Sequence, residues 1–234
     1  TGCETTTPQD HSSIGKEYGS GRCNLPALPD AISTMTLFGQ KTIRVAAAVA
    51  VVASGLGAAE WRVDPSHSAA QFSVRHMMVS TVRGHFGKIS GAVTYEPGAP
   101  EKAQVAVEVD VASVDTRNEK RDAHLRSEDF FFVEKFPTMV FRSKRVERSA
   151  NSGLRLIGDL TIRGVTKEVT FDVEGLATPI KDARGNLRTG ATATAKIHRK
   201  DFGLTWNRAL EAGGWTLGDE VTLTVDVELI SSSG

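Results

Sequence analysis

The feature that most constrains the fold of this chain is an alternation of apolar and polar residues with a period of two. It is clearest in residues 70–74, 105–111, 169–173 and 221–227. Successive side chains of a β-strand point to opposite faces, so each of these segments has one apolar and one polar face. Weaker forms of the same pattern occur in residues 89–95, 139–146, 154–162 and 189–197.

Turn signals rich in Gly, Pro, Asn and Asp separate these segments, at residues 96–101, 148–153, 161–168 and 181–186. Many short strands divided by turns predict a sandwich or a barrel. We expect one all-β domain, an antiparallel β-barrel of about eight strands, which is a size that encloses side chains or one small ligand. Only residues 118–130 and the shorter stretch 207–213 have helical character, so one or two short helices are expected.

Residues 35–59 have the pattern of a secretory signal peptide. Lys41 and Arg44 supply positive charge, residues 45–53 are an unbroken apolar run, and residues 57–59 are small. Cleavage after Ala59 would place the mature protein in the periplasm or outside the cell. The alternatives are a buried core helix and a membrane anchor, but the apolar run is shorter than the ~20 residues of a spanning helix. We therefore expect no stable membrane span.

Residues 1–34 precede the signal pattern, show no periodicity and contain no initiator methionine. We interpret them as a disordered upstream extension that is absent from the native protein, with Met35 as the true start and residues 60–234 as the mature domain. Both cysteines, Cys3 and Cys23, lie in this extension. The rest of the chain has no thiol, which excludes cysteine catalysis and cysteine-ligated metal there.

Charge and motifs exclude several classes of function. The 28 basic and 28 acidic residues balance, which gives no electrostatic reason to expect nucleic acid or an acidic membrane as partner. None of the histidines of the mature domain has the spacing of a known zinc motif, and neither a nucleophile elbow nor a phosphate loop is present. We expect no metal and no cofactor.

The most concentrated group of polar residues lies in residues 121–126. On a helix, Arg121, His124 and Leu125 share one side, while Asp122 and Arg126 are four apart and can pair. One interpretation is a salt-bridged helix that closes the barrel, with residues 130–132 sealing the core. The other is that Arg121 and His124 face a barrel mouth and bind an anionic or polar head group, which suits the planar fork of arginine.

Five stretches of the chain resemble one family: residues 61–91, 109–141, 158–171, 197–207 and 217–229. Together they are similar to the YceI-like polyisoprenoid-binding family, from Trp61 to about Ile230. The resemblance implies a lipocalin-like barrel that is exported to the periplasm or secreted. It implies a long isoprenoid lipid in an elongated central pore, no metal and no established catalytic residue. It also implies homodimers for some members.

The resulting hypothesis is a protein that holds a prenyl pyrophosphate or an isoprenoid quinone for transport, storage or stress response. The residues expected to line the tail are Phe72, Val74, Val107, Val109, Phe130, Phe131, Phe141, Leu160, Phe171, Phe202, Trp206, Val225 and Val227. Those expected at the head group are His67, His76, Arg121, His124 and Arg199.

Three alternatives remain open from the sequence. The residues expected along the tail could instead form a packed core, because an inward side chain does not distinguish pore from core. Those expected at the head group could instead form surface ion pairs. A hydrolase or isomerase would use His124 with Asp122 or Glu128, although no nucleophile is evident. A packed-barrel structural or interaction module would have no internal channel. We expect a binding protein without enzymatic activity.

Overall fold

The computed structural model describes residues 59–96, 98–149, 153–211 and 213–231. The expected upstream extension, and the signal segment as far as residue 58, lie outside these residues. Twelve strands form one sheet in which every ladder is antiparallel. They are β1 (Ala59–Val63), β2 (Ala69–His76), β3 (Ser80–Phe86), β4 (Ile89–Tyr95), β5 (Gln104–Asp110), β6 (Val114–Asp115), β7 (Thr138–Arg148), β8 (Leu154–Ile162), β9 (Val165–Glu174), β10 (Ile180–Lys181), β11 (Leu187–His198) and β12 (Leu217–Ser231).

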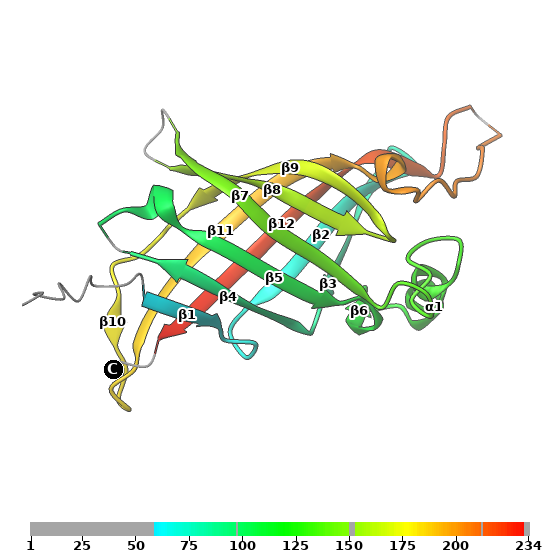
Figure 1. Cartoon of the computed structure of the whole chain (residues 1–234). Coiled ribbons are helices and arrows are strands. Elements are labelled where there is room, and N and C mark those ends of the chain that lie inside the picture. Colours follow the sequence, from blue (N-terminus) through cyan, green and yellow to red (C-terminus); the bar gives the residue numbers. More distant parts are fainter. Residues whose placement is uncertain (1–58, 97, 150–152, 212, 232–234) are drawn as a thin grey trace, which may run out of the picture. The chain divides into compact units, whose positions relative to one another are not determined.

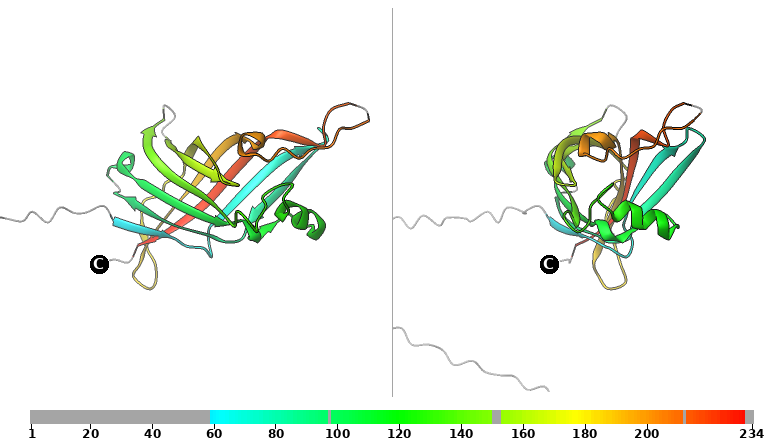
Figure 2. Two further views of the ribbon diagram at one scale, coloured as in Figure 1. Left: turned by 45° about the vertical axis from the view of Figure 1, so that its right-hand side comes forward. Right: turned by 90° about the vertical axis from the view of Figure 1, so that its right-hand side faces the viewer.

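Eight of these strands close into a ring in the order β11–β9–β8–β7–β5–β4–β1–β12, because β12 also pairs with β11. Figure 1 shows the tilted strands of this barrel, and the end-on view of Figure 2 shows the ring. The predicted antiparallel barrel of about eight strands is confirmed, with α1 (Glu119–Arg126) as the one α-helix of the described residues. A barrel of this size has an interior just wide enough for side chains or a small ligand.

The ring is complete at only one end of the barrel. One edge of β12 pairs with β1 at Leu229 and Ile230, and the same edge pairs with β2 between Leu217 and Asp226. Strands β2, β3 and β6 therefore form a leaf that continues the sheet beyond the ring. Figure 1 shows α1 and β6 at this end of the domain and β10 at the other. We call the end that carries α1 the rim.

The predicted strands are confirmed apart from their ends. Residues 89–95 and 154–162 are β4 and β8, and the strand predicted to include Val111 ends one residue earlier, at Asp110, because a 3₁₀ turn follows. The 118–130 prediction is confirmed as the shorter helix α1. Strands β1, β3, β6 and β10 were not predicted from the sequence. Strand β3 lacks a clear alternation of apolar and polar residues because one of its inward positions is Gly84. The Phe72 ring occupies the space of the missing side chain, and a Cβ at Gly84 would lie 2.5 Å from it.

The helix predicted for residues 207–213 is wrong. Ala209 instead forms an isolated antiparallel bridge with Trp215. The Asn207 side chain accepts from the backbone N of Arg208 and of Leu217, so it stabilises a loop that returns to β12. The bond from Arg208 is a local side-chain to backbone bond, of the kind that asparagine favours over a helix interior.

Candidate functional site: an apolar cavity with a polar rim

The interior of the barrel contains a cavity of about 630 Å³, which lies within the size range of small-molecule sites. We call it the large chamber. Of the residues expected to line a lipid tail, it is lined by Phe72, Val74, Val107, Val109, Phe130, Phe131, Phe141, Leu160, Phe171, Trp206 and Val225. The packed-barrel alternative predicts no internal channel, and this cavity contradicts it.

A second interior cavity of about 140 Å³ continues toward the other end of the barrel. We call it the small chamber. It is lined by apolar side chains and Tyr95, and it includes Val227 from the expected tail set. Burial raises the pKa of the Tyr95 phenol. Four residues line both chambers, namely Val107, Phe141, Phe171 and Val225, and we call these four the waist.

Helix α1 supplies the charged part of the rim. Asn118 caps its start, with Oδ1 accepting from the backbone N of Arg121 at 3.0 Å. At its end, the Ser127 hydroxyl donates to the carbonyl of His124. The helix places Lys120, Arg121, His124 and Leu125 along the large chamber, so the predicted common side of Arg121, His124 and Leu125 is confirmed.

Arg121 is held by Thr116 and, through it, by Asp122. Arg121 Nε donates to the Thr116 hydroxyl and Nη2 to the Thr116 carbonyl, both at 2.7 Å. Buried Asp122 accepts from the Thr116 backbone N at 2.9 Å and also from its hydroxyl. The pairing that their spacing allows between Asp122 and Arg126 does not form, because Arg126 donates to the carbonyls of Ala112 and Val114 instead. Asp122 therefore fixes the loop that orients Arg121.

His124 lies among aromatic rings at the rim. Its ring meets Phe130 and Trp206 edge-on, with centroid distances of 5.0 and 4.9 Å. Its Nε2 lies 2.8 Å from a carboxylate oxygen of Asp129, whereas the enzyme alternative expected Asp122 or Glu128 as the partner. Among the described residues, no hydroxyl group bonds to the His124 ring, so the arrangement lacks the nucleophile that covalent catalysis needs.

Arg199 was expected at the head group, and the structure shows how its charge is satisfied. It is only 4% exposed, and it donates to the carbonyls of Leu204, Trp206 and Gly218 and to the carboxylate of Asp219. Burial lowers the pKa of this guanidinium, which the nearby carboxylate partly offsets. Arg199 lines the large chamber, but its bonds show that it holds the loop of Trp206 in place. Nearby Phe202, expected to line the tail, is fully buried and contributes to neither chamber.

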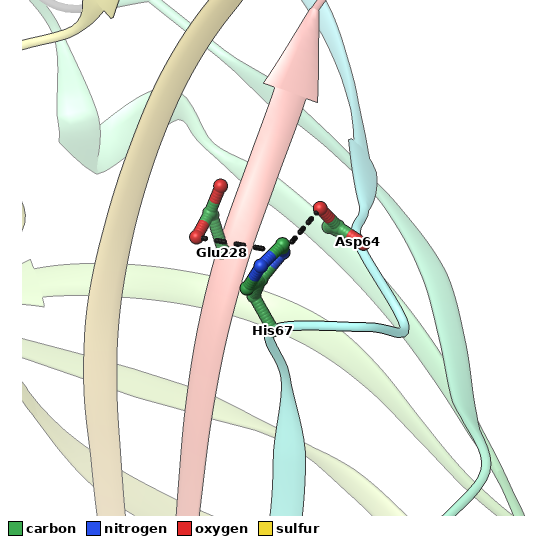
Figure 3. Close-up of side chains that lie close together, drawn as sticks. All are labelled: Asp64, His67 and Glu228. Atoms are coloured by element: carbon green, nitrogen blue, oxygen red, sulfur yellow. Dashed lines mark hydrogen bonds and ion pairs between the residues drawn. The ribbon is translucent and has the colours of Figure 1, made fainter.

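His67 lies away from the other expected head-group residues. It precedes β2, whereas His76 is the last residue of that eight-residue strand and lines the large chamber. Figure 3 shows His67 between the carboxylates of Asp64 and Glu228. Its hydrogen bond with Asp64 raises the pKa of His67. The same bond, with those from the Ser66 backbone N and from Arg188, lowers the pKa of Asp64 to about 2.

The ligand atoms of Asp64, His67 and Glu228 lie within 4.8 Å of one another, a spacing that would suit a metal ion. Arg188 takes this role instead, because its Nη1 donates to both Asp64 and Glu228. Its Nε donates to Asp182 at 2.9 Å. This bond holds the pKa of the Asp182 carboxyl well below its usual range, and further bonds from the side chain and backbone of Asn186 and the backbone of Arg184 add to the effect. The cluster is an ion-pair network that ties β11 and β12 to the turn before β2.

Several rim residues were missed by the sequence analysis. Lys120, Ser80 and Thr216 line the large chamber, and Lys120 and Ser80 are exposed, so the chamber reaches the surface there. The position of Lys120 beside Arg121 was the signal available in the sequence.

Exposed apolar side chains lie next to the mouth of the large chamber. They are Met77, Met78 and Val79, in the β2–β3 turn between His76 and Ser80, and Trp215, in the loop before β12. A backbone bond from Met77 to Thr216 joins the two segments.

Comparison with known proteins identifies the family. Residues 61–229 match the model of the YceI-like domain. The chain belongs to the YceI-like family. A UPF0312 protein of Staphylococcus aureus strain MSSA476 is 36% identical over 165 residues, which cover 70% of this chain and 94% of that protein. The resemblance found in the sequence is confirmed, with almost the same limits.

Solved structures share the barrel. A YceI protein of Campylobacter jejuni is 32% identical with a TM-score of 0.58, covering 68% of this chain and 90% of that one. BcnA of Burkholderia cenocepacia is 22% identical with a TM-score of 0.59, covering 71% and 98%. A polyisoprenoid binding domain from Saccharophagus degradans is 13% identical with a TM-score of 0.51, covering 74% and 98%. These last two likenesses concern the fold alone. Within the described residues, no helix has the length and apolar character needed to span a membrane.

Proposed function

We propose that this YceI-like barrel binds a long-chain isoprenoid lipid, with the tail in the large chamber and an anionic head group at the rim. The observation that carries the proposal is the pairing of an apolar cavity of about 630 Å³ with a rim whose charged lining residues are all basic. The polyisoprenoid binding domain of Saccharophagus degradans, which shares the fold, supports the same class of ligand.

The tail supplies most of the affinity in this proposal. Each buried methylene contributes ~0.8 kcal/mol. If each carbon with its hydrogens takes about the volume of one water molecule in the liquid, ~30 Å³, the large chamber accommodates about 20 carbons, or about four isoprene units. The measured affinity will be well below the sum, because ordering the chain and losing its free motion oppose binding. A branched, purely hydrocarbon tail fits walls of Val, Leu, Ile and Phe that offer it no hydrogen-bonding partner.

The rim favours a negatively charged head group. Lys120, Arg121, His76 and His124 line the large chamber near its mouth, and no Asp or Glu of the described residues lines it. Among the described residues, the side chains of Lys120 and His76 have no ion-pair partner, and Arg121 has no carboxylate partner. Thr116 accepts one N–H from Nε and one from Nη2, so both N–H groups of Nη1 and the second one of Nη2 are left for a ligand. This arrangement favours a prenyl pyrophosphate over an isoprenoid quinone, which carries no charge.

The remaining parts of the proposal concern the setting. The signal pattern of residues 35–59 supports export to the periplasm or secretion, where a lipid carrier would transport or store its cargo or act in a stress response. We propose binding without catalysis, because His124 contacts a carboxylate and two aromatic rings but no nucleophile. The homodimer and the absence of a cofactor stay predictions.

The test compares a prenyl pyrophosphate with the prenyl alcohol of the same length. Wild type should prefer the pyrophosphate, and Arg121→Ala should reduce this preference by about 10- to 100-fold, since a hydrogen bond to a charged group contributes about 1.5–3 kcal/mol. The affinity for the alcohol should change little. Glu119→Ala, in the same helix and exposed, is the matched control. Equal affinity of wild type for both ligands would contradict an anionic head group, and failure to bind either would contradict the lipid carrier.

A further inference from the structure

The waist divides the interior of the barrel at a defined level. Phe141 of β7 and Phe171 of β9 are 8% and 5% exposed, and their rings meet nearly edge-on with a centroid distance of 5.2 Å. Val107 of β5 is the ladder partner of Phe141, and Val225 of β12 completes the set. The two phenylalanine rings are thus the bulkiest side chains that line both chambers.

Strand β8 shows how the sequence builds this level. Leu156 lines the small chamber and Leu160 lines the large chamber, and Gly158 lies between them on the same face. A Cβ at Gly158 would lie 2.7 Å from Cζ of Phe141. The missing side chain of Gly158 therefore makes room for the Phe141 ring, which is the large-against-small matching that dense packing requires.

We propose that Phe141 and Phe171 set the length of the isoprenoid tail that this barrel accepts, an inference that rests on the proposed function. With the two rings in contact, the tail is confined to the large chamber and to about four isoprene units. The small chamber adds room for about one more unit at ~30 Å³ for each carbon. A longer tail reaches it only when the rings separate and lose their edge-on contact, which disfavours binding by about two- to ten-fold.

The test presents the purified protein with an equimolar mixture of all-trans prenyl pyrophosphates of roughly two to eight isoprene units, which bracket the capacity of the large chamber. Native mass spectrometry then reads which lengths are bound. Wild type should select chains of about four units. Phe171→Leu removes the edge-on contact while keeping an apolar residue, so the bound lengths should shift upward by about one unit.

Two further variants make the shift specific to the waist. Ala193 lines the small chamber only, so Ala193→Leu should leave the wild-type length distribution unchanged. The double variant Phe171→Leu/Ala193→Leu should return the shifted distribution to the wild-type range, because the newly joined space is filled. Phe202→Leu removes the same atoms from a fully buried ring that lines neither chamber, and it controls for loss of stability without a change in length.

The outcomes separate this inference from the function on which it rests. Binding of all lengths without selection by wild type, or an unchanged distribution in Phe171→Leu, overturns the role of the waist and leaves the lipid carrier intact. A shift in Phe202→Leu equal to that in Phe171→Leu also overturns it. Absence of any bound prenyl chain in wild type overturns both proposals.

Discussion

Replacing Asp122 by alanine should lower the free energy of unfolding of the domain more than an alanine substitution at any exposed position of helix α1. The buried carboxylate accepts two hydrogen bonds from Thr116, which is itself 5% exposed. Hydrogen bonds to a charged group contribute about 1.5–3 kcal/mol each, and an unsatisfied buried N–H costs about 1–3 kcal/mol. Because the two bonds share one partner and are not additive, we expect a loss of about 2–4 kcal/mol in the free energy of unfolding.

Thermal unfolding followed by circular dichroism measures this loss. For a domain of this size each kcal/mol shifts Tm by about 2–4 °C, so Asp122→Ala should lower Tm by roughly 4–16 °C. Asp122→Asn keeps an acceptor oxygen in place and should lose about half as much. Glu119→Ala, at an exposed position of the same helix, should cost less than about 1 kcal/mol.

The same variant has a second readout. Since Thr116 holds Arg121 in place, Asp122→Ala should also weaken the preference for prenyl pyrophosphate over prenyl alcohol. A Tm within about 2 °C of wild type, or a loss no larger than that of Glu119→Ala, would refute the reasoning that this carboxylate anchors the rim.

Two further predictions concern backbone packing and pH. Gly158→Ala should destabilise the domain by more than about 2 kcal/mol, because its Cβ would lie 2.3 Å from the Arg142 carbonyl O, whereas Gly218→Ala, with its nearest contact at 3.4 Å, should be close to neutral in chemical denaturation. The contribution of the Asp64–His67 pair should be greatest between the unfolded pKa values of 3.8 and 6.5. It is lost as pH falls toward the lowered pKa of Asp64, about 2, and as pH rises through the raised pKa of His67. The contribution is small, because the His67 side chain is 60% exposed. Since His67 loses its charge above its raised pKa, the stability difference between wild type and His67→Gln should vanish at high pH. A difference that instead grows with pH above 6.5 would show that the assumed pairing is wrong.

The barrel was predictable because strands with one buried face carry their own signal. The alternation at residues 221–227 predicts a strand with one buried face, and these residues lie in β12. Strand β3 escaped because its inward position 84 is a glycine whose space belongs to Phe72, a fact that only the packing reveals. Residues 207–213 have helical character in the sequence, but Asn207 bonds to Leu217, ten residues ahead. A hydrogen-bond partner this far along the chain cannot be predicted from the local sequence.

The candidate site was predictable in kind more than in detail. Inward residues such as Phe72 and Phe171 follow from strand alternation, yet alternation does not separate a chamber wall from packed core, as Phe202 shows. Arg199 and His67 are basic residues that looked available in the sequence, but carbonyl groups and carboxylates already surround them in the fold. Whether a cation is free for a ligand depends on partners far away in the chain, such as Glu228 for the network around His67.

The seam at β12 has a consequence for how the protein is made. This strand pairs with β1, β2 and β11, and it follows all three in the chain. All the other strands of the ring therefore leave the ribosome before β12, the strand that joins the two edges of the sheet. Until then the nascent sheet keeps exposed edges and an uncovered apolar lining, the state most prone to aggregation. Closure of the barrel, and with it any capacity to hold cargo, is a late event that depends on pairing between distant parts of the chain.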